Sequence, residues 1–243
     1  MTTIVRNSSH GNAIRVIFFP EKGLYRKVTF NPRGQALLKS EASGISWYYS
    51  RNNYDDSKVR FHCHKKYARL DFPCLRGFKV DYGLPFSKNF LFFELALSHY
   101  ISTWPVSREV PCHGDLTLDN ILIHSDSAVF IDWEHFQGTG ECWGFDLCYL
   151  CLSMICLPFL QGRRINPEDW ALFTKYWRKL RDLGVNDDVI QNPIHYFRVA
   201  LESNSTWIDI VKASPNKMYP LIIDSAFCDL LQKKLDCKVG ISC

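Results

Sequence analysis

Carboxylates and an amide stand in one stretch of the chain whose other residues have the composition of buried strands. The stretch VPCHGDLTLDNILIHSDSAVFIDWEHF, residues 110–136, holds Asp115, Asp119, Asn120 and Asp132. Such side chains are either solvated loop residues or groups that hold a metal ion and move a proton. Mg²⁺ takes oxygen ligands, and a carboxylate that the metal does not need can accept a proton from a hydroxyl. The stretch therefore has the residue types for metal-assisted transfer chemistry.

The local pattern predicts how these side chains are positioned. A β-like run at 121–123 and a second strand at 127–134 are separated by the tight turn HSDS. A hairpin of these two strands would bring Asn120 and Asp132 to the same mouth, with Asp115 one loop away. Their oxygens would then converge, as a hard cation such as Mg²⁺ requires.

Three motifs occur in order along this part of the chain. HGD at 113–115 is followed by four residues and Asn120, IDWE stands at 131–134, and GFDL stands at 144–147. Together they resemble the catalytic core of the aminoglycoside phosphotransferase and choline kinase family, which are small-molecule kinases with a protein-kinase-like fold. The resemblance implies ATP and Mg²⁺ as cofactors and a small-molecule hydroxyl as the acceptor.

The resemblance also implies roles for individual residues. Asp115 would be the catalytic base that orients the acceptor hydroxyl, and Asn120 and Asp132 would bind the Mg²⁺ that bridges the ATP phosphates. His113 would brace the loop, and Asp146 would cap or tie down that loop. Asp119 is read as a solvated loop acid, and Glu134 is either a group near the metal or merely an acid at a strand end.

The N-terminal third supplies candidates for holding the nucleotide. In kinases of this kind a strand lysine holds phosphates and a helix acid holds the lysine. Lys27 falls on a predicted strand at 24–30, and Glu41 follows on a predicted helix at 31–51. This spacing is similar to the family pattern.

The segment NSSHGN, residues 7–12, stands in the place of the phosphate-covering loop of such kinases. Ser9, His10 and Gly11 are therefore candidate nucleotide contacts. The segment has one glycine, so it departs from the glycine-rich loops of protein kinases.

The order of predicted elements gives the fold class. Strands and one helix come first, and from about residue 83 the pattern is mainly helical. We predict an α+β, protein-kinase-like, two-lobed fold, with a small antiparallel β N-lobe at 1–83 that binds the nucleotide. The C-lobe at 84–243 would hold the catalytic loop, the metal site and a helical acceptor site. The predicted strands are 2–7, 13–19, 24–30, 60–72 and 75–82, and the later helices are 87–104 with Ser87 as N-cap, 144–157, 166–184 with Asn166 as N-cap, and 192–237 with breaks at Pro215 and Pro220.

Composition limits the remaining possibilities. Hydrophobic residues make up 47% and aromatic residues 14% of the 243 residues, which predicts a packed globular core. The net charge of +4 is spread without long runs of one sign, so nucleic-acid binding is not expected. No apolar run is long enough to span a membrane, and the first residues do not resemble a secretion signal.

The ten cysteines then indicate buried free thiols in a reducing cytoplasm. Cys148 and Cys151 form a CxxC inside an apolar helix, which favours a core role over a zinc or redox site. His62 and His64 share one face of a strand, and a metal pair there is the less favoured alternative.

The acceptor is the least determined feature. Acidic and basic residues are mixed in the helical half, so a sugar or glycan-precursor hydroxyl is preferred over the cationic acceptors that an acidic pocket would suit. The alternatives are an aminoglycoside phosphotransferase and a nucleotide-binding pseudokinase scaffold. A protein kinase is disfavoured because HGD replaces the arginine-containing HRD form and no APE-like motif follows Asp132. The oligomeric state is not assigned.

Overall fold

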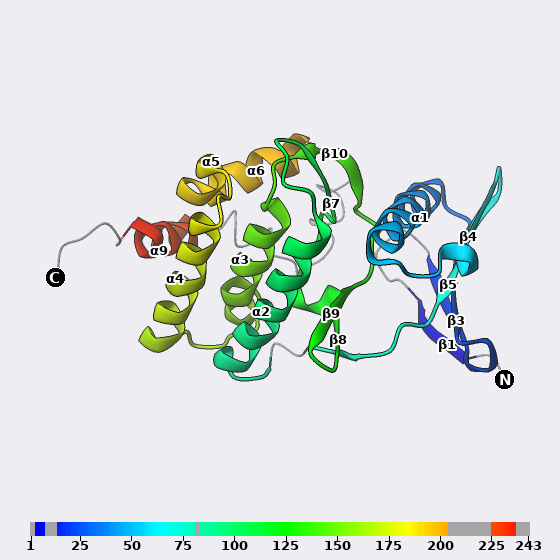
Figure 1. Cartoon of the computed structure of the whole chain (residues 1–243), viewed down its shortest axis with the longest axis horizontal. Helices are drawn as coiled ribbons and strands as arrows, with labels where there is room; N and C mark the ends of the chain where they lie inside the picture. The colour runs from blue at the N-terminus through cyan, green and yellow to red at the C-terminus, as the bar shows by residue number, and fades with distance from the viewer. Residues whose placement is uncertain (1–2, 8–13, 81–82, 204–224, 237–243) are drawn as a thin grey trace.

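The computed structural model describes residues 3–7, 14–80, 83–203 and 225–236. Its first part is an antiparallel sheet with one long helix, and helices dominate the rest. Figure 1 shows the sheet and this helix, α1, at one end of the molecule and the later helices at the other. The predicted α+β class with two lobes is confirmed.

The strands form three antiparallel sheets. The largest has five strands in the order β1-β2-β3-β5-β4, and smaller sheets pair β6-β8-β9 and β10-β7. The strands are β1 Thr3–Asn7, β2 Arg15–Phe19, β3 Leu24–Thr29, β4 Arg60–His64, β5 Tyr67–Pro73, β6 Phe78–Lys79, β7 Val110–Cys112, β8 Ile121–His124, β9 Ser127–Phe130 and β10 Gln137–Glu141.

The helices follow the predicted order. The described helices are α1 Pro32–Asn52, α2 Phe86–Thr103, α3 Phe145–Leu160, α4 Pro167–Asp182, α5 Asp187–Gln191, α6 Pro193–Ser203 and α9 Ser225–Asp236, with short 3-10 helices η1 Pro20–Lys22, η2 Asp56–Lys58 and η3 Leu118–Asn120. The predicted breaks at Pro215 and Pro220 lie outside the described residues.

Two predicted strands were wrong in extent. The predicted strand 60–72 is a hairpin, β4 and β5, that turns at Lys65 and Lys66, because its two halves pair with each other. The predicted strand 75–82 contains only β6. This strand pairs with β8, which lies within residues 110–136, and not with the N-terminal sheet.

Helix ends show where local signals decide. α4 begins as predicted, because the Asn166 side chain accepts the Asp169 backbone N–H in a capping box and Pro167 takes the first helical position. The predicted cap of α2 was wrong. Its N-cap is Pro85, and Ser87 lies within the helix without capping it.

Gly44 sits inside α1, where a glycine normally weakens a helix. A Cβ at this position would lie 2.7 Å from the Cβ of Trp133 and 2.9 Å from that of Phe136. The helix therefore approaches the IDWE segment more closely than any side chain at position 44 would permit.

Aromatic side chains fill the contact between α1, α2 and the stretch at residues 110–136. The Tyr48 ring lies 4.9 Å from that of Trp133 and 6.0 Å from that of Phe130. Trp47 lies 4.8 Å from Trp104, which directly follows α2. Each fully buried aromatic ring contributes about 2–3 kcal/mol of burial free energy, so this cluster fixes α1 against the catalytic stretch.

The apolar helix α3 is buried on most sides, and Cys148 and Cys151 lie in the hydrophobic core as predicted. The eight described cysteines are free thiols, and burial raises the pKa of both core thiols well above the ordinary value. Within the described ranges, no helix combines the length and the apolar composition that a membrane crossing requires.

Candidate active site

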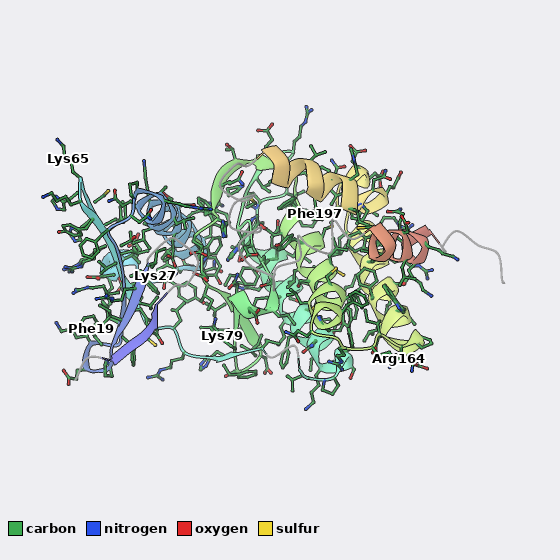
Figure 2. All side chains as sticks on the ribbon, turned by 180° about the vertical axis from the view of Figure 1, so that it is seen from behind. Phe19, Lys27, Lys65, Lys79, Arg164 and Phe197 are labelled. Atoms are coloured by element: carbon green, nitrogen blue, oxygen red, sulfur yellow. The ribbon has the colours of Figure 1, made fainter. Side chains whose placement is uncertain are left out.

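Lys27 is held between two carboxylates that come from distant parts of the chain. Its ammonium lies 2.7 Å from Glu41 Oε1 on α1 and 2.6 Å from Oδ1 of Asp132, which follows β9. Lys27 points to this side because it alternates along β3 with Arg26 and Val28, which face the other side of the sheet. Figure 2 labels Lys27 on the sheet beside α1.

The two carboxylates keep the lysine charged. Burial alone would lower the pKa of Lys27, but the charges of Asp132, Glu41 and Glu134 outweigh burial and raise this pKa above its ordinary value. Glu41 is only 1% exposed, and burial raises its pKa to about 7 although Lys27 opposes that change. Among the described residues, Glu41 Oε2 has no hydrogen-bond partner.

Asp132 reaches Lys27 through an unusual backbone conformation. The predicted strand 127–134 ends at Phe130, and Asp132 has a φ of +66°. Aspartate tolerates this left-handed region better than most residues, and such strain is concentrated at functional sites. The Asp132 side chain is 30% exposed, so a ligand from solvent can reach the carboxylate.

A second group of polar residues surrounds Asp115. The Asn120 side-chain amide donates to the Asp115 carbonyl at 2.7 Å and lies 3.4 Å from Asp115 Oδ2. The hairpin of β8 and β9 forms as predicted, and the Ile131 N–H donates to the Asn120 carbonyl. Asn120 and Asp132 thus lie at the same end of this hairpin.

Asp146 ties the catalytic loop to the first turn of α3. Its carboxylate accepts the backbone N–H of His113 at 2.8 Å and that of Gly114 at 3.0 Å. Burial raises the Asp146 pKa to about 7, against the effect of these two donors. Gly114 has a φ of +82°, and a Cβ there would lie 2.4 Å from the His135 carbonyl oxygen, so the loop needs glycine at this point.

His113 braces the loop from inside. Its Nε2 lies 2.9 Å from the Ile131 carbonyl, which can only accept, so the ring proton is on Nε2. Nδ1 is then an acceptor and faces the Asp115 backbone N–H at 3.4 Å. The neutral ring therefore connects the HGD motif to the strand end that carries Asp132.

The structure brings most of the predicted site residues together. Lys27, Glu41 and Asp132 form one network, and Asp115 and Asn120 form a second, joined to the first through the Ile131 backbone. The segment with Ser9, His10 and Gly11 lies outside the described residues. Asp119 is exposed on η3, and Glu134 is near enough to Lys27 to raise the pKa of the lysine.

One residue near Asp115 was missed by the reading of the sequence. The Tyr149 hydroxyl on α3 donates to Asp115 Oδ1 at 3.2 Å. The signal that could have found it is its spacing of one helical turn from Asp146, which places both side chains on the same face of α3. In the part of the chain that is described, no group of three or more His, Cys, Asp or Glu side chains is placed to bind a metal.

Residues 64–140 match the model of the phosphotransferase enzyme family. This segment includes Asp115, Asn120 and Asp132, and it leaves out Lys27 and Glu41. The predicted family resemblance is confirmed. The predicted enzyme class, a phosphotransferase with an alcohol group as acceptor, is confirmed with it.

Among solved structures, the chain is similar to an ethanolamine kinase of Plasmodium vivax. The sequence identity is 13%, the match covers 98% of this chain and 81% of that one, and the TM-score is 0.42. At these values the likeness says nothing of the acceptor. No curated protein matches the chain.

Proposed function

We propose that this protein is an ATP- and Mg²⁺-dependent kinase that transfers the γ-phosphoryl group to a hydroxyl of a small molecule, a sugar or glycan precursor. The observation that carries the proposal is the buried ammonium of Lys27 between Glu41 and Asp132. Kinases of this fold require a β3 lysine paired with a helix glutamate, and a metal-binding aspartate beside them.

A purely structural role explains this network poorly. Taking Lys27 and Glu41 out of water costs several kcal/mol per ion, and apolar side chains of similar volume stabilise a fold equally well or better. The three charges come from β3, α1 and the segment after β9. A chain that keeps them together at this cost is best explained by a function for the charges.

The residues present also fit a magnesium ion. One ammonium and two carboxylates leave the Lys27 network with a net negative charge, which attracts a cation. Asn120 and Asp132 lie at one end of the hairpin and supply an amide oxygen and a carboxylate, the hard ligands that Mg²⁺ prefers. Held by Asn120 and Asp132, the ion would supply positive charge that offsets the negative charge developing on the nucleotide phosphates during transfer.

Asp115 is suited to the proton. It is 7% exposed, and its two carboxylate oxygens face the Tyr149 hydroxyl and the Asn120 amide, which hold the carboxylate in one orientation. As the acceptor hydroxyl oxygen bonds to the γ-phosphorus, the bond from that phosphorus to the bridging oxygen of ADP breaks. The hydroxyl proton passes to Asp115, and ADP leaves.

The acceptor is tested by a coupled assay of ATP consumption. The panel contains sugars, an aminoglycoside such as kanamycin, and choline. We expect turnover with a sugar and little with the two cationic compounds. Turnover with kanamycin alone would assign the chain to the aminoglycoside alternative, and the absence of turnover across the panel would count against the sugar proposal.

The pseudokinase alternative is tested by thermal unfolding with ATP, with and without Mg²⁺. A ligand that binds only the folded state at 100 times its Kd stabilises that state by about 2.7 kcal/mol. We expect a rise in Tm that needs Mg²⁺ and is lost in Asp132→Asn. An ATP-dependent rise in Tm without Mg²⁺, together with no ATP consumption, would instead support a nucleotide-binding scaffold.

We further propose that the protein works in the cytoplasm. The eight described free thiols, several of them buried in the core, support a reducing compartment.

A further inference from the structure

α3 contacts the catalytic loop at two points one helical turn apart. Asp146 in its first turn accepts two backbone N–H groups of the loop, and Tyr149 donates its hydroxyl to Asp115 Oδ1 at 3.2 Å. Side chains three residues apart lie on the same face of a helix. One face of α3 therefore holds both the backbone of the loop and the carboxylate that the loop carries.

The Tyr149 ring is fixed before any substrate binds. The side chain is 4% exposed, and its ring lies 5.6 Å from that of Phe197 on α6, which is fully buried. Figure 2 labels Phe197 on the α6 ribbon. A tyrosine side chain has only two rotatable bonds before its hydroxyl, so a packed ring delivers the hydroxyl to one place.

We infer that Tyr149 is a positioning residue for Asp115. The Tyr149 hydroxyl holds the Asp115 carboxylate in the rotamer that faces the acceptor. The inference rests on the proposed function, because it assigns to Asp115 the role of proton acceptor. Asn120 lies beside Oδ2 and Tyr149 beside Oδ1, so the two donors approach the carboxylate on different oxygens. A carboxylate held in this way meets the acceptor proton without a further rotation.

The test is Tyr149→Phe, which keeps the ring and removes the hydroxyl. Kinetics are measured with MgATP and the best acceptor of the sugar, kanamycin and choline panel. We expect kcat per active site to fall about tenfold with the KM for ATP within twofold. Loss of packing alone would lower the fraction of active sites, measured by titration with ATP, and leave kcat per active site unchanged.

Tyr176→Phe is the matched control. Tyr176 on α4 is also buried, its hydroxyl faces the carboxylate of Glu94, and its ring stacks on Phe90 at 4.8 Å. We expect wild-type kcat for this variant. A kcat per active site in Tyr149→Phe that equals the values of Tyr176→Phe and wild type would overturn the inference.

A double-mutant cycle tests the contact without activity. Urea unfolding is measured for wild type, Tyr149→Phe, Asp115→Ala and the double variant. We expect the single Tyr149→Phe change to lower the folding equilibrium constant about tenfold more in wild type than in the Asp115→Ala background. Coupling without any phosphoryl transfer by the wild type would mean that the proposed function fails while the contact stands, and additivity would remove the contact itself.

Discussion

The two polar networks of the site are built from different kinds of partner. The Lys27 network consists of charged side chains from three separate elements, and its geometry depends on how those elements pack. The Asp115 network consists mainly of backbone N–H groups, one amide and one hydroxyl around two carboxylates. The geometry of the Lys27 network is therefore sensitive to the loss of any one charge. The Asp115 network is held in place by short-range contacts between its loop and α3.

The largest effect on activity is expected from a change in the Asp115 network. Asp115→Ala should lower kcat by about 10²–10⁴-fold, the usual contribution of a general base, because the acceptor proton then has no positioned acceptor. ATP binding, measured by thermal shift with Mg²⁺, should be nearly unchanged because Asp115 lies outside the Lys27 network. Wild-type turnover in this variant would remove the proposed mechanism.

The largest effect on stability is expected from a change in the Lys27 network. Lys27→Met should lower the free energy of unfolding by about 3–5 kcal/mol, because it leaves two neighbouring carboxylates without their cation. Urea unfolding at pH 7.5 measures the loss.

The double variant Lys27→Met/Glu41→Gln is the control for this interpretation. It should recover part of the stability, since it removes one of the uncompensated charges. A loss below about 1 kcal/mol in the single variant is typical of exposed ion pairs and would show that the network is open to solvent.

A hydrogen bond between uncharged side chains on α1 and α2 lies outside both networks. It offers a test of whether the fold tolerates a charge at this position. The Tyr48 hydroxyl on α1 accepts the Phe130 N–H and lies 2.5 Å from His99 Nε2 on α2. Burial lowers the His99 pKa from 6.5 to about 4. Between these two pH values the unfolded chain binds more protons than the folded one.

The free energy of unfolding is therefore unaffected by His99 above about pH 6.5. As the pH falls from 6.5 to 4, protonation of His99 in the unfolded chain lowers this free energy by about 3 kcal/mol in total. His99→Gln keeps an acceptor for Tyr48 and removes the titration. Unfolding free energies of both proteins at pH 4.5, 5.5 and 7 measure the difference. Parallel curves for wild type and His99→Gln would show that the histidine is solvated.

The smallest effect is expected at Asp146. Asp146→Asn keeps one acceptor oxygen for the two N–H groups of the loop and places an amide against the other, which should cost about 1.5–3 kcal/mol of stability. We expect kcat to fall more than the KM for ATP rises, because the loop shifts around Asp115 while Lys27 keeps its partners. An increase in the KM for ATP alone would connect Asp146 to the nucleotide instead of the loop.

Local sequence signals predicted much of this structure. The hairpin around HSDS, the Asn166 cap and the strand that carries Lys27 all depend on residues close in sequence. The spacing of Lys27 and Glu41 was informative because a strand followed by a helix leaves few ways to bring the two together.

Contacts between distant elements could not be read in the same way. The predicted strand 60–72 has no strong turn residue at Lys65 and Lys66, so its division into β4 and β5 depends on pairing. Ser87 is a good cap by type, but Pro85 ends the preceding segment first. Tyr149 has an ordinary place in an apolar helix, and only the packing of α3 against the loop reveals its partner.

The close approach of α1 at Gly44 has a consequence for control of the enzyme. In many kinases the helix that carries the glutamate swings away to switch activity off. Here Gly44 lies against Trp133 and Phe136, and the Ser40 hydroxyl donates to the Phe136 carbonyl at 2.7 Å, so this helix is locked to the segment that follows Asp132. We expect an enzyme without an off position of α1, whose rate in the cell follows the supply of its two substrates.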